Sequence, residues 1–376
     1  MKVKQKSIFV IFILLLLLPV LSFPVAKNYI DSANHENRTF ASFPQFTFSR
    51  EGIKNYPEAF EEWFNDHLPY KNQLVVMDNR RKRFLQEETT AIEYKGSTCA
   101  LEGKHHWLFY NAQNENESSF DDYLCNNLYT EEQLEQIAGR YLQFQNFLKD
   151  RGAEFVLMYA ANKEQIYPEY MPATIIRTKS YSRTDQLVDY LRANTGIPVL
   201  YTKDALMEEK QKGYQVFAKY DTHWNNLGGF VGGQLLNEYC HGKRVGLDEM
   251  QISVVNTHKS GDLADLLAMG NLYNDDKEWV VDNYKENVKV QMVQEDDGYY
   301  EFCSNAEDER NVLAVTDSFG YGLMAEMPKD FATVTFIQNT EDFRSYVETR
   351  HPDIVMVEIV ERARTRQERE VEGLMW

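Results

Sequence analysis

Two short segments carry the residue types that nucleophilic acyl transfer needs. The first, AKYDTHWNNLGG, holds Asp221 and His223, and the second, VLAVTDSFGYG, holds Ser318 directly after an apolar run. A serine hydroxyl is a weak nucleophile, so it needs a base within hydrogen-bond reach, and the base needs an orienting partner. A serine at a strand-to-helix turn also offers its backbone N–H to an oxyanion. Ser318, His223 and Asp221 are therefore candidates for this chemistry.

Each segment also has a simpler interpretation. Taken alone, Asp317-Ser318 is more typical of a helix cap, because Ser and Asp are preferred there. Asp221 and His223 are two apart and share one side of an extended backbone, but the pair can equally begin a capped helix or ligate a metal. The nearest other candidate metal ligands are His105, His106 and His258, and none stands at a diagnostic spacing. We therefore predict no metal and no cofactor.

Short apolar runs alternate with amphipathic segments through the second half of the chain. Continuous apolar runs predict buried strands, at 155–161, 197–201, 312–316, 333–337 and 353–360. Helical periodicity predicts helices, at 131–151, 185–193, 202–211 and 225–239. Strands that are apolar on both faces and separated by helices indicate a mostly parallel sheet covered on both sides. The predicted fold is a three-layer α/β sandwich.

Less regular stretches flank this pattern. Residues 245–305 are interpreted as an insertion or as edge β-structure, and LEGKHHWLFY at 101–110 as a hairpin or strand. A mixed aromatic and polar stretch comes earlier, with Pro44, Pro57 and Pro69 as expected breaks. From Pro57, the spacing of its aromatic residues predicts a short amphipathic helix in a stalk.

The N-terminal segment predicts membrane attachment. Three lysines precede an apolar run over 8–25, and acidic residues follow it. The length of this run is where signal peptides and short membrane-spanning helices overlap. The charge pattern places the rest of the chain outside the cytoplasm. We favour an uncleaved, single-pass anchor over a cleaved signal, with a signal segment at 1–26, a stalk and helical extension at 27–90, and an α/β domain at 91–376.

Composition excludes some classes of protein. The 376 residues carry a net charge of -18, which disfavours binding to nucleic acid. Four cysteines stand far apart, at 99, 125, 240 and 303, without metal-binding spacings. Free thiols are the simpler interpretation. An exported chain can instead form disulfides, and Cys99 with Cys125 is the pair closest in sequence.

In combination the motifs resemble a known family. The chain resembles the alginate O-acetyltransferase AlgJ/AlgX group, related to the DHHW proteins, whose SGNH-hydrolase-like domain has its Asp-x-His motif before the serine. The resemblance spans residues 34–362, nearly the whole exported chain. Its specific blocks are DTHW and TDSFG, and others include GKHHWLFY, YAANKEQIYPEYMP, GDLADLL and PDIVMVEIVER.

This resemblance implies that Ser318 is the nucleophile, His223 the general base and Asp221 its orienting acid. It also implies acetyl transfer to hydroxyls of an exported or cell-surface polysaccharide through an acetyl-serine, with a membrane-bound O-acyltransferase supplying the acetyl group. An anchored, AlgJ-like layout at the cell membrane is expected, since the last predicted strand lies close to the end of the chain.

The oxyanion hole departs from the SGNH pattern. Glu358 or Glu361 stands near the position of the family's asparagine, and an ionised carboxylate cannot donate a hydrogen bond. The Ser318 N–H then needs a second donor, and Tyr321 and Arg362 are the candidates for oxyanion or substrate binding. Arg362 can alternatively pair with Glu358 and brace the site.

Two other functions stay open at this point. A carbohydrate acetylesterase would use the same triad with water as acceptor. A non-catalytic polysaccharide-binding protein would have no need of the three residues together. The negative net charge disfavours a polyuronate, because like charges repel, and so favours a neutral or amino sugar acceptor.

Overall fold

The computed structural model describes residues 41–67, 77, 81, 100–111, 119–267, 269–296, 298–338, 343–363 and 374. The predicted signal segment at 1–26 and much of the 27–90 extension lie outside these residues. Within the described residues, no helix is both long enough and apolar enough to cross a bilayer. The described residues fall into two compact units, one up to residue 92 together with 265–269 and the other comprising the remainder from residue 93.

The larger unit is built on a seven-stranded sheet with the strand order β4-β3-β11-β9-β10-β8-β7. The strands of this sheet are β3 (Glu154–Ala160), β4 (Val199–Tyr201), β7 (Val290–Asp296), β8 (Tyr299–Ser304), β9 (Asn311–Val315), β10 (Thr333–Ile337) and β11 (Ile354–Val360). The five from β4 to β10 pair in parallel, whereas β8 is antiparallel to both of its neighbours. The sheet is therefore mixed, with the predicted parallel part and an antiparallel hairpin at one edge.

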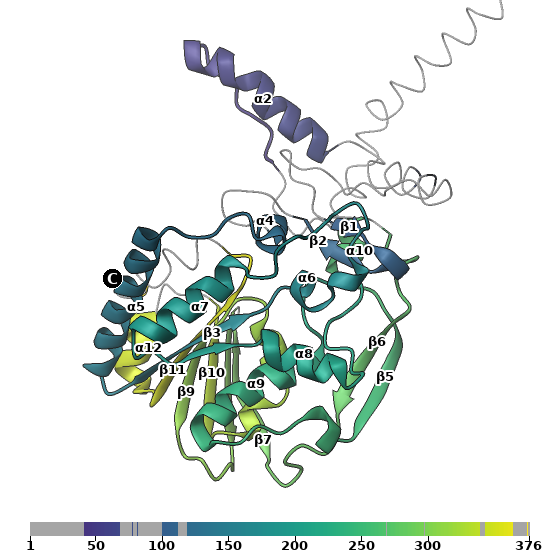
Figure 1. Ribbon diagram of the computed structural model, residues 1–376. Coiled ribbons are helices and arrows are strands. Elements are labelled where there is room, and N and C mark those ends of the chain that lie inside the picture. The colour runs from purple at the N-terminus through teal and green to yellow at the C-terminus, as the bar shows by residue number, and fades with distance from the viewer. Residues whose placement is uncertain are drawn as a thin grey trace, which may run out of the picture. The chain divides into compact units, whose positions relative to one another are not determined.

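Two groups of helices cover the sheet (Figure 1). One group is α5 (Glu131–Lys149), α7 (Arg183–Asn194) and α12 (Phe343–Arg350), and the other is α8 (Lys203–Gln211), α9 (Asn226–His241) and α11 (Gly320–Leu323). Helices α7 and α12 connect parallel strands in one direction along the sheet, and α11 connects β9 to β10 in the opposite direction. Right-handed crossovers in opposite directions place their helices on opposite faces. The predicted three-layer arrangement is confirmed.

Smaller elements complete this unit. They are β1 (Ala100–Glu102), β2 (Leu108–Tyr110), α4 (Ser119–Leu124), α6 (Lys163–Ile166), β5 (Ile252–Lys259), α10 (Asp262–Leu266) and β6 (Asp276–Val281). Strands β1 and β2 form the hairpin predicted at 101–110. The stretch at 245–305 contributes both a separate hairpin, β5-β6, and the edge hairpin β7-β8.

The smaller unit contains helix α2 (Arg50–Asp66), which is longer than predicted. The hydroxyl of Ser49 accepts a hydrogen bond from the Gly52 N–H and caps the helix, which therefore begins well before Pro57. Pro57 was expected to break the chain, but it lies inside the helix, where it removes one N–H donor without ending it. Edge-on aromatic contacts hold the preceding chain to the helix, with ring centroids of Phe43 and Trp63 4.8 Å apart.

Cys125, Cys240 and Cys303 carry free thiols, and Cys125 is buried. The pairing of Cys125 with Cys99 is therefore not formed, and Cys99 itself lies outside the described residues. Burial raises the pKa of the Cys240 thiol to about 11.

Helices α9 and α11 approach each other closely at Gly229 and Gly322. A Cβ added at Gly229 would lie 2.1 Å from the carbonyl oxygen of Gly322, whereas nothing lies within 4 Å of one added at Gly139 in α5. Gly229→Ala should lower the free energy of unfolding by about 1–3 kcal/mol, because backbone must move. Gly139→Ala should raise it by roughly 0.5–1 kcal/mol, because it removes only unfolded-state entropy. Denaturant unfolding of both variants checks this, and equal effects would contradict the close packing.

Candidate active site

The turn that carries Ser318 follows β9 at the carboxyl edge of the parallel strands. Asp317 is buried in this turn, and its two carboxylate oxygens accept the N–H groups of Phe319 and Val360, each at 2.8 Å. These bonds tie the turn to itself and to β11. Ser318 is exposed between two buried neighbours. The turn thus presents the hydroxyl to solvent on a backbone that is fixed on both sides.

The histidine lies on a tight loop between α8 and α9. Phe217 and Trp224 form a single antiparallel bridge, and the Ala218 N–H donates to the carbonyl of His223 at 3.3 Å. The side chain of Asn225 then accepts the N–H groups of Leu227 and Gly228 and starts α9. The indole N–H of Trp224 donates to the carbonyl of Phe319 at 3.0 Å, which joins this loop to the serine turn.

The three candidate residues form one continuous chain of hydrogen bonds. The Oγ of Ser318 lies 2.7 Å from Nε2 of His223, and Nδ1 of His223 lies 2.6 Å from Oδ1 of Asp221. Oδ1 of Asp221 also accepts the His223 backbone N–H at 3.0 Å. Because the carboxylate faces Nδ1, it favours the tautomer that leaves Nε2 free to accept the serine proton. This is the arrangement that a serine nucleophile requires.

A second carboxylate supports this chain. Asp262 donates its backbone N–H to Oδ2 of Asp221 at 3.1 Å, and its own carboxylate accepts the N–H of Thr222 at 2.7 Å and the hydroxyl of Thr222 at 2.6 Å. Its Oδ2 is 3.7 Å from Nδ1 of His223. Asp262 thus orients Asp221 and places further negative charge beside the imidazole.

The two carboxyl groups differ in pKa for physical reasons. Burial would raise the pKa of Asp221, but hydrogen bonds from His223 and its positive charge outweigh burial and hold that pKa below its usual range. Burial raises the pKa of Asp262, and the neighbouring charge of Asp221 raises it further. Asp221 is therefore the carboxyl group of the two that stays ionised to the lower pH.

Lys163, at the start of α6, holds the histidine loop from below. Its Nζ donates to the carbonyls of Asp221 at 2.8 Å and Lys219 at 3.0 Å. The ammonium is fully buried, 5.3 Å from the centre of the Trp107 ring. Burial lowers the pKa of Lys163 to about 8, although Asp221 raises it. The hydrogen bonds to the two loop carbonyls offset part of the cost of burying this ammonium group.

Ligand atoms of Asp221, His223 and Asp262 all lie within 4.8 Å of one another, close enough to hold a cation. Protein groups already use these atoms, since Asp221 accepts from His223 and Asp262 accepts from Thr222. Nε2 of His223, the remaining ring nitrogen, is directed at Ser318. This directionality fits proton transfer to and from serine.

The acidic residues near the expected oxyanion hole brace the backbone. Glu358 accepts the Asp317 N–H at 3.3 Å, and Glu361 accepts the Asn162 N–H at 2.9 Å. The Arg362 guanidinium lies 5.3 Å over the Phe319 ring, beside the serine turn, and its buried Nε has no hydrogen-bond partner among the described residues. Tyr321 is half exposed, and its hydroxyl donates to Gln338 at 3.1 Å. Of the two donor candidates, Arg362 is the one with unused donors.

A large part of the chain matches a known protein family. Residues 100–306, more than half of the chain, match the family described as ALGX, SGNH hydrolase-like domain, acetyltransferase AlgX. The chain belongs to this family. The matched AlgX-family region includes Asp221, His223 and Asp262 and ends before Ser318. No curated protein sequence matches the chain significantly.

Three solved structures of low identity are similar to this AlgX-family chain, and the first of them, with a TM-score above 0.5, shares its fold. A DHHW family protein from Eubacterium siraeum is 10% identical with a TM-score of 0.51, covering 76% of this chain and 97% of its own. PatB1 from Bacillus cereus is 15% identical with a TM-score of 0.49, covering 71% and 96%. The O-acetyltransferase domain of Pseudomonas putida AlgJ is 17% identical with a TM-score of 0.44, covering 74% and 98%.

Two residues of the site were not singled out from the AlgX-family sequence motifs. Asp262 stands in GDLADLL and Lys163 in YAANKEQIYPEYMP, and both blocks were part of the resemblance. Neither residue has a spacing that points to the triad, because each reaches it from a distant segment. In the sequence, the one signal for Lys163 was its position two residues after the strand predicted at 155–161.

Asp262→Asn tests the supporting carboxylate. We expect kcat to fall about tenfold, because a nearby negative charge that favours the imidazolium is lost. The acidic limb of the pH–rate profile should move to lower pH for the same reason. Ester hydrolysis between pH 5 and 9 measures both effects. Asp265→Asn, an exposed residue three positions later, is the matched control. A fall in rate with an unmoved profile would reduce Asp262 to a purely structural role.

Lys163 makes stability depend on pH. Its pKa is about 8 in the folded chain and 10.5 when unperturbed, so between these values the unfolded chain binds more protons. Stability from this group therefore rises with pH across that window, by at most about 1.4 kcal/mol per pH unit. The difference in unfolding free energy between the native protein and Lys163→Met, measured from pH 7.5 to 10, should show this slope. A flat difference would mean that the lysine pKa is not lowered.

Proposed function

We propose that the protein is an extracytoplasmic O-acetyltransferase that transfers acetyl groups to hydroxyls of an exported or cell-surface polysaccharide through an acetyl-serine on Ser318. The observation that carries this proposal is the hydrogen-bonded chain from Ser318 through His223 to Asp221. Membership of the AlgX family supports acetyl transfer as the chemistry.

The first half-reaction forms the acyl-enzyme. His223 accepts the Ser318 proton on Nε2 as Oγ attacks the acetyl carbonyl of the donor. Asp221 stabilises the imidazolium through Nδ1–H. The tetrahedral intermediate then collapses, His223 returns the proton to the leaving group, and the acetyl group stays on Ser318. A membrane-bound O-acyltransferase is the proposed source of the acetyl group.

The oxyanion needs at least two donors in such a step. We assign one to the backbone N–H of Ser318, at the start of the turn into α11. Arg362 supplies the second, because its guanidinium lies against Phe319, the residue after the nucleophile. A charged donor in a largely buried position is worth more than a neutral one. We assign Tyr321, half exposed on α11, to contact with the acceptor.

The second half-reaction chooses between transfer and hydrolysis. A sugar hydroxyl gives its proton to His223 and attacks the acetyl-serine, releasing acetylated sugar and the free enzyme. Water in the same place would give acetate and make the protein an acetylesterase. A neutral or amino sugar polymer is the proposed acceptor, since the chain carries a net charge of -18. The N-terminal segment is proposed to hold this domain at the outer side of the cell membrane.

Mass spectrometry of the protein with a chromogenic acetyl ester tests the proposal. The native protein should gain one acetyl group on Ser318 and pass it to an added oligosaccharide. Ser318→Ala should gain none, with an unchanged unfolding midpoint. His223→Ala and Asp221→Ala should each slow acylation by at least about 10²-fold, and the losses should not add, because the residues act as one unit.

Two results would contradict parts of the proposal. Acetylation of Ser318→Ala at the native rate would remove the nucleophile assignment. Acetate release without sugar acetylation, across neutral and amino sugar oligomers, would make the protein an acetylesterase.

A further inference from the structure

A second pocket lies at the opposite edge of the sheet from Ser318. It has a volume of about 660 Å³ and is formed at the end of α9, by the turn at 283–288 and by the loop that precedes β9. Its walls include His241, Lys243, Lys285, Asp308, Arg310 and Asp330. Its volume falls within the usual range for small-molecule sites, about 300–1,000 Å³. No step of the acyl transfer uses these residues.

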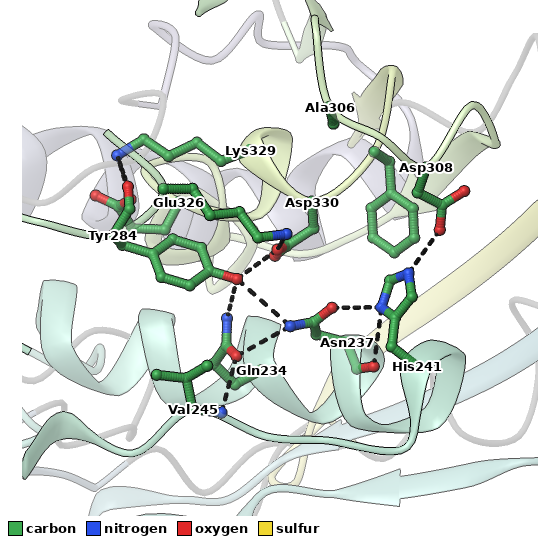
Figure 2. A network of polar contacts seen from close by, with 12 residues as sticks. Gln234, Asn237, His241, Val245, Tyr284, Ala306, Asp308, Glu326, Lys329 and Asp330 are labelled. Carbon is green, nitrogen blue, oxygen red and sulfur yellow. Dashed lines mark hydrogen bonds and ion pairs between the residues drawn. The ribbon is translucent and has the colours of Figure 1, made fainter. Parts of the chain in front are cut away.

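A buried polar network forms the floor of this pocket (Figure 2). The Val245 N–H donates to Gln234, and the Gln234 amide donates to the hydroxyl of Tyr284 at 2.8 Å. Tyr284 in turn donates to Asp330. Asn237 joins the network through Gln234 at 3.2 Å. Burying four polar side chains together has a desolvation cost that apolar side chains at the same positions would avoid.

His241 connects this floor to the rim. Its Nδ1 lies 2.5 Å from the side-chain oxygen of Asn237, and its Nε2 lies 2.8 Å from Asp308. Arg310 holds the same Asp308 carboxylate through Nε and Nη2. The rim is therefore rigid, with its charged groups held in defined positions before any ligand arrives.

Asp330 lines the pocket, and one of its two carboxylate oxygens has no partner among the described residues. It is 2% exposed, and its Oδ1 accepts from Tyr284 and from Lys285 Nζ at 2.6 Å. Its Oδ2 is buried and has no hydrogen-bond partner among the described residues. Burial raises the pKa of this carboxyl. A buried acceptor without a partner calls for a donor from outside the chain.

Lys285 supplies the matching donors. Its backbone has a φ of 42°, a left-handed conformation that a lysine rarely adopts, and this turn brings the ammonium onto Asp330. The side chain is 37% exposed, and only one of its three N–H groups is used on Asp330. A ligand would therefore meet the two remaining N–H donors of Lys285 beside the Asp330 carboxylate.

The charges of the wall favour a neutral ligand. Each of three wall cations already has a carboxylate within 2.6 Å: Lys285 has Asp330, Lys329 has Glu326 and Arg310 has Asp308. Glu307 adds a further carboxylate to the lining. Lys243, the fourth wall cation, lies 3.8 Å from Glu249, so phosphate or a uronate would face these carboxylates with every wall cation already beside a carboxylate. A hydroxyl group donates and accepts at once, so a polyhydroxylated ligand matches paired ions that have spare donors and acceptors.

We propose that this pocket is a second saccharide-binding site, which holds a neutral segment of the polysaccharide away from Ser318. This reading rests on the proposed function. Helix α9 begins beside the His223 loop and ends at His241, so its 16 residues separate the two sites by about 24 Å. An oligosaccharide long enough to cover this distance can be retained at the pocket while its other units meet the acetyl-serine.

Direct binding to the full-length protein tests the site without relying on catalysis. The probes are a β-1,4-linked glucose hexamer, the corresponding N-acetylglucosamine hexamer, a galacturonate hexamer and inorganic phosphate. A neutral hexamer should bind in calorimetry and should slow amide exchange in peptides covering 283–289 and 305–310. Lys285→Gln should weaken its Kd about tenfold, as expected for one charge-assisted hydrogen bond. Lys289→Gln makes the same charge change at an exposed position four residues later, and should leave Kd unchanged.

Asp330→Asn is the second variant, and it should weaken binding while retaining the floor's shape. Its unfolding midpoint identifies loss of fold, in which case Lys285→Gln alone decides. Exchange protection at the pocket without any acetyl transfer would sink the acceptor assignment and leave the saccharide site standing. Acetyl transfer to sugar with no protection at the pocket would overturn the second site alone. Binding of phosphate or galacturonate in preference to both neutral hexamers would also overturn it.

Discussion

The position of Ser318 depends on the hydrogen bonds that the Asp317 carboxylate accepts. Strand ends and tight turns leave backbone N–H groups without partners, and a buried N–H left unpaired is costly. Asp317 accepts two of them, from Phe319 within the turn and from Val360 on β11. Glu358 accepts the N–H of Asp317 itself. Each bond joins a backbone N–H to a carboxylate and none uses the Ser318 side chain, so the turn keeps its shape whatever that side chain does.

The histidine loop is also held by charged side chains that bind its backbone, and here they are of both signs. Asp221 and Asp262 accept the N–H groups of the loop, whereas Lys163 donates to its carbonyls. Two carboxylates so close together would repel each other, and a buried lysine beneath them offsets part of that repulsion. The loop and the turn then meet through Trp224 and Phe319. The 2.7 Å contact between His223 and Ser318 is the result of these supports on both sides.

Sequence patterns predicted the elements whose signal is local. The apolar run before Asp317 predicted β9, and the periodic segment at 131–151 predicted α5, because burial on both faces or on one stripe shows directly in composition. The break predicted at Pro57 was wrong because a proline removes only one backbone N–H donor, and α2 continues through it despite that loss. The antiparallel edge was left open, since pairing direction depends on β10 meeting β8 across distant segments.

The candidate site shows the same division between local and distant effects. Asp221 and His223 were accessible as a pair because they are two residues apart on one loop. Asp262 was not, because its contacts with Thr222 cross 40 positions of the chain. Glu358 was placed at the oxyanion hole by analogy with a family pattern, yet its carboxylate serves the backbone of the turn. Only the position of Arg362 beside Phe319 gives the departure a chemical explanation, since a guanidinium can donate where a carboxylate cannot.

Helix α9 links the two edges of the sheet and explains an otherwise unfavourable composition. Glycine destabilises a helix interior, yet α9 contains four, at 228, 229, 232 and 233. Gly229 meets the backbone of Gly322, and Gly232 meets the ring of Trp224, so larger side chains would push α11 and the histidine loop away. At its other end the same helix has no such glycine, and its polar residues Gln234, Asn237 and His241 join the hydrogen-bond network at the second pocket. The helix therefore has lower intrinsic stability where α11 and the histidine loop approach it, and its polar side chains make their contacts only beyond that point.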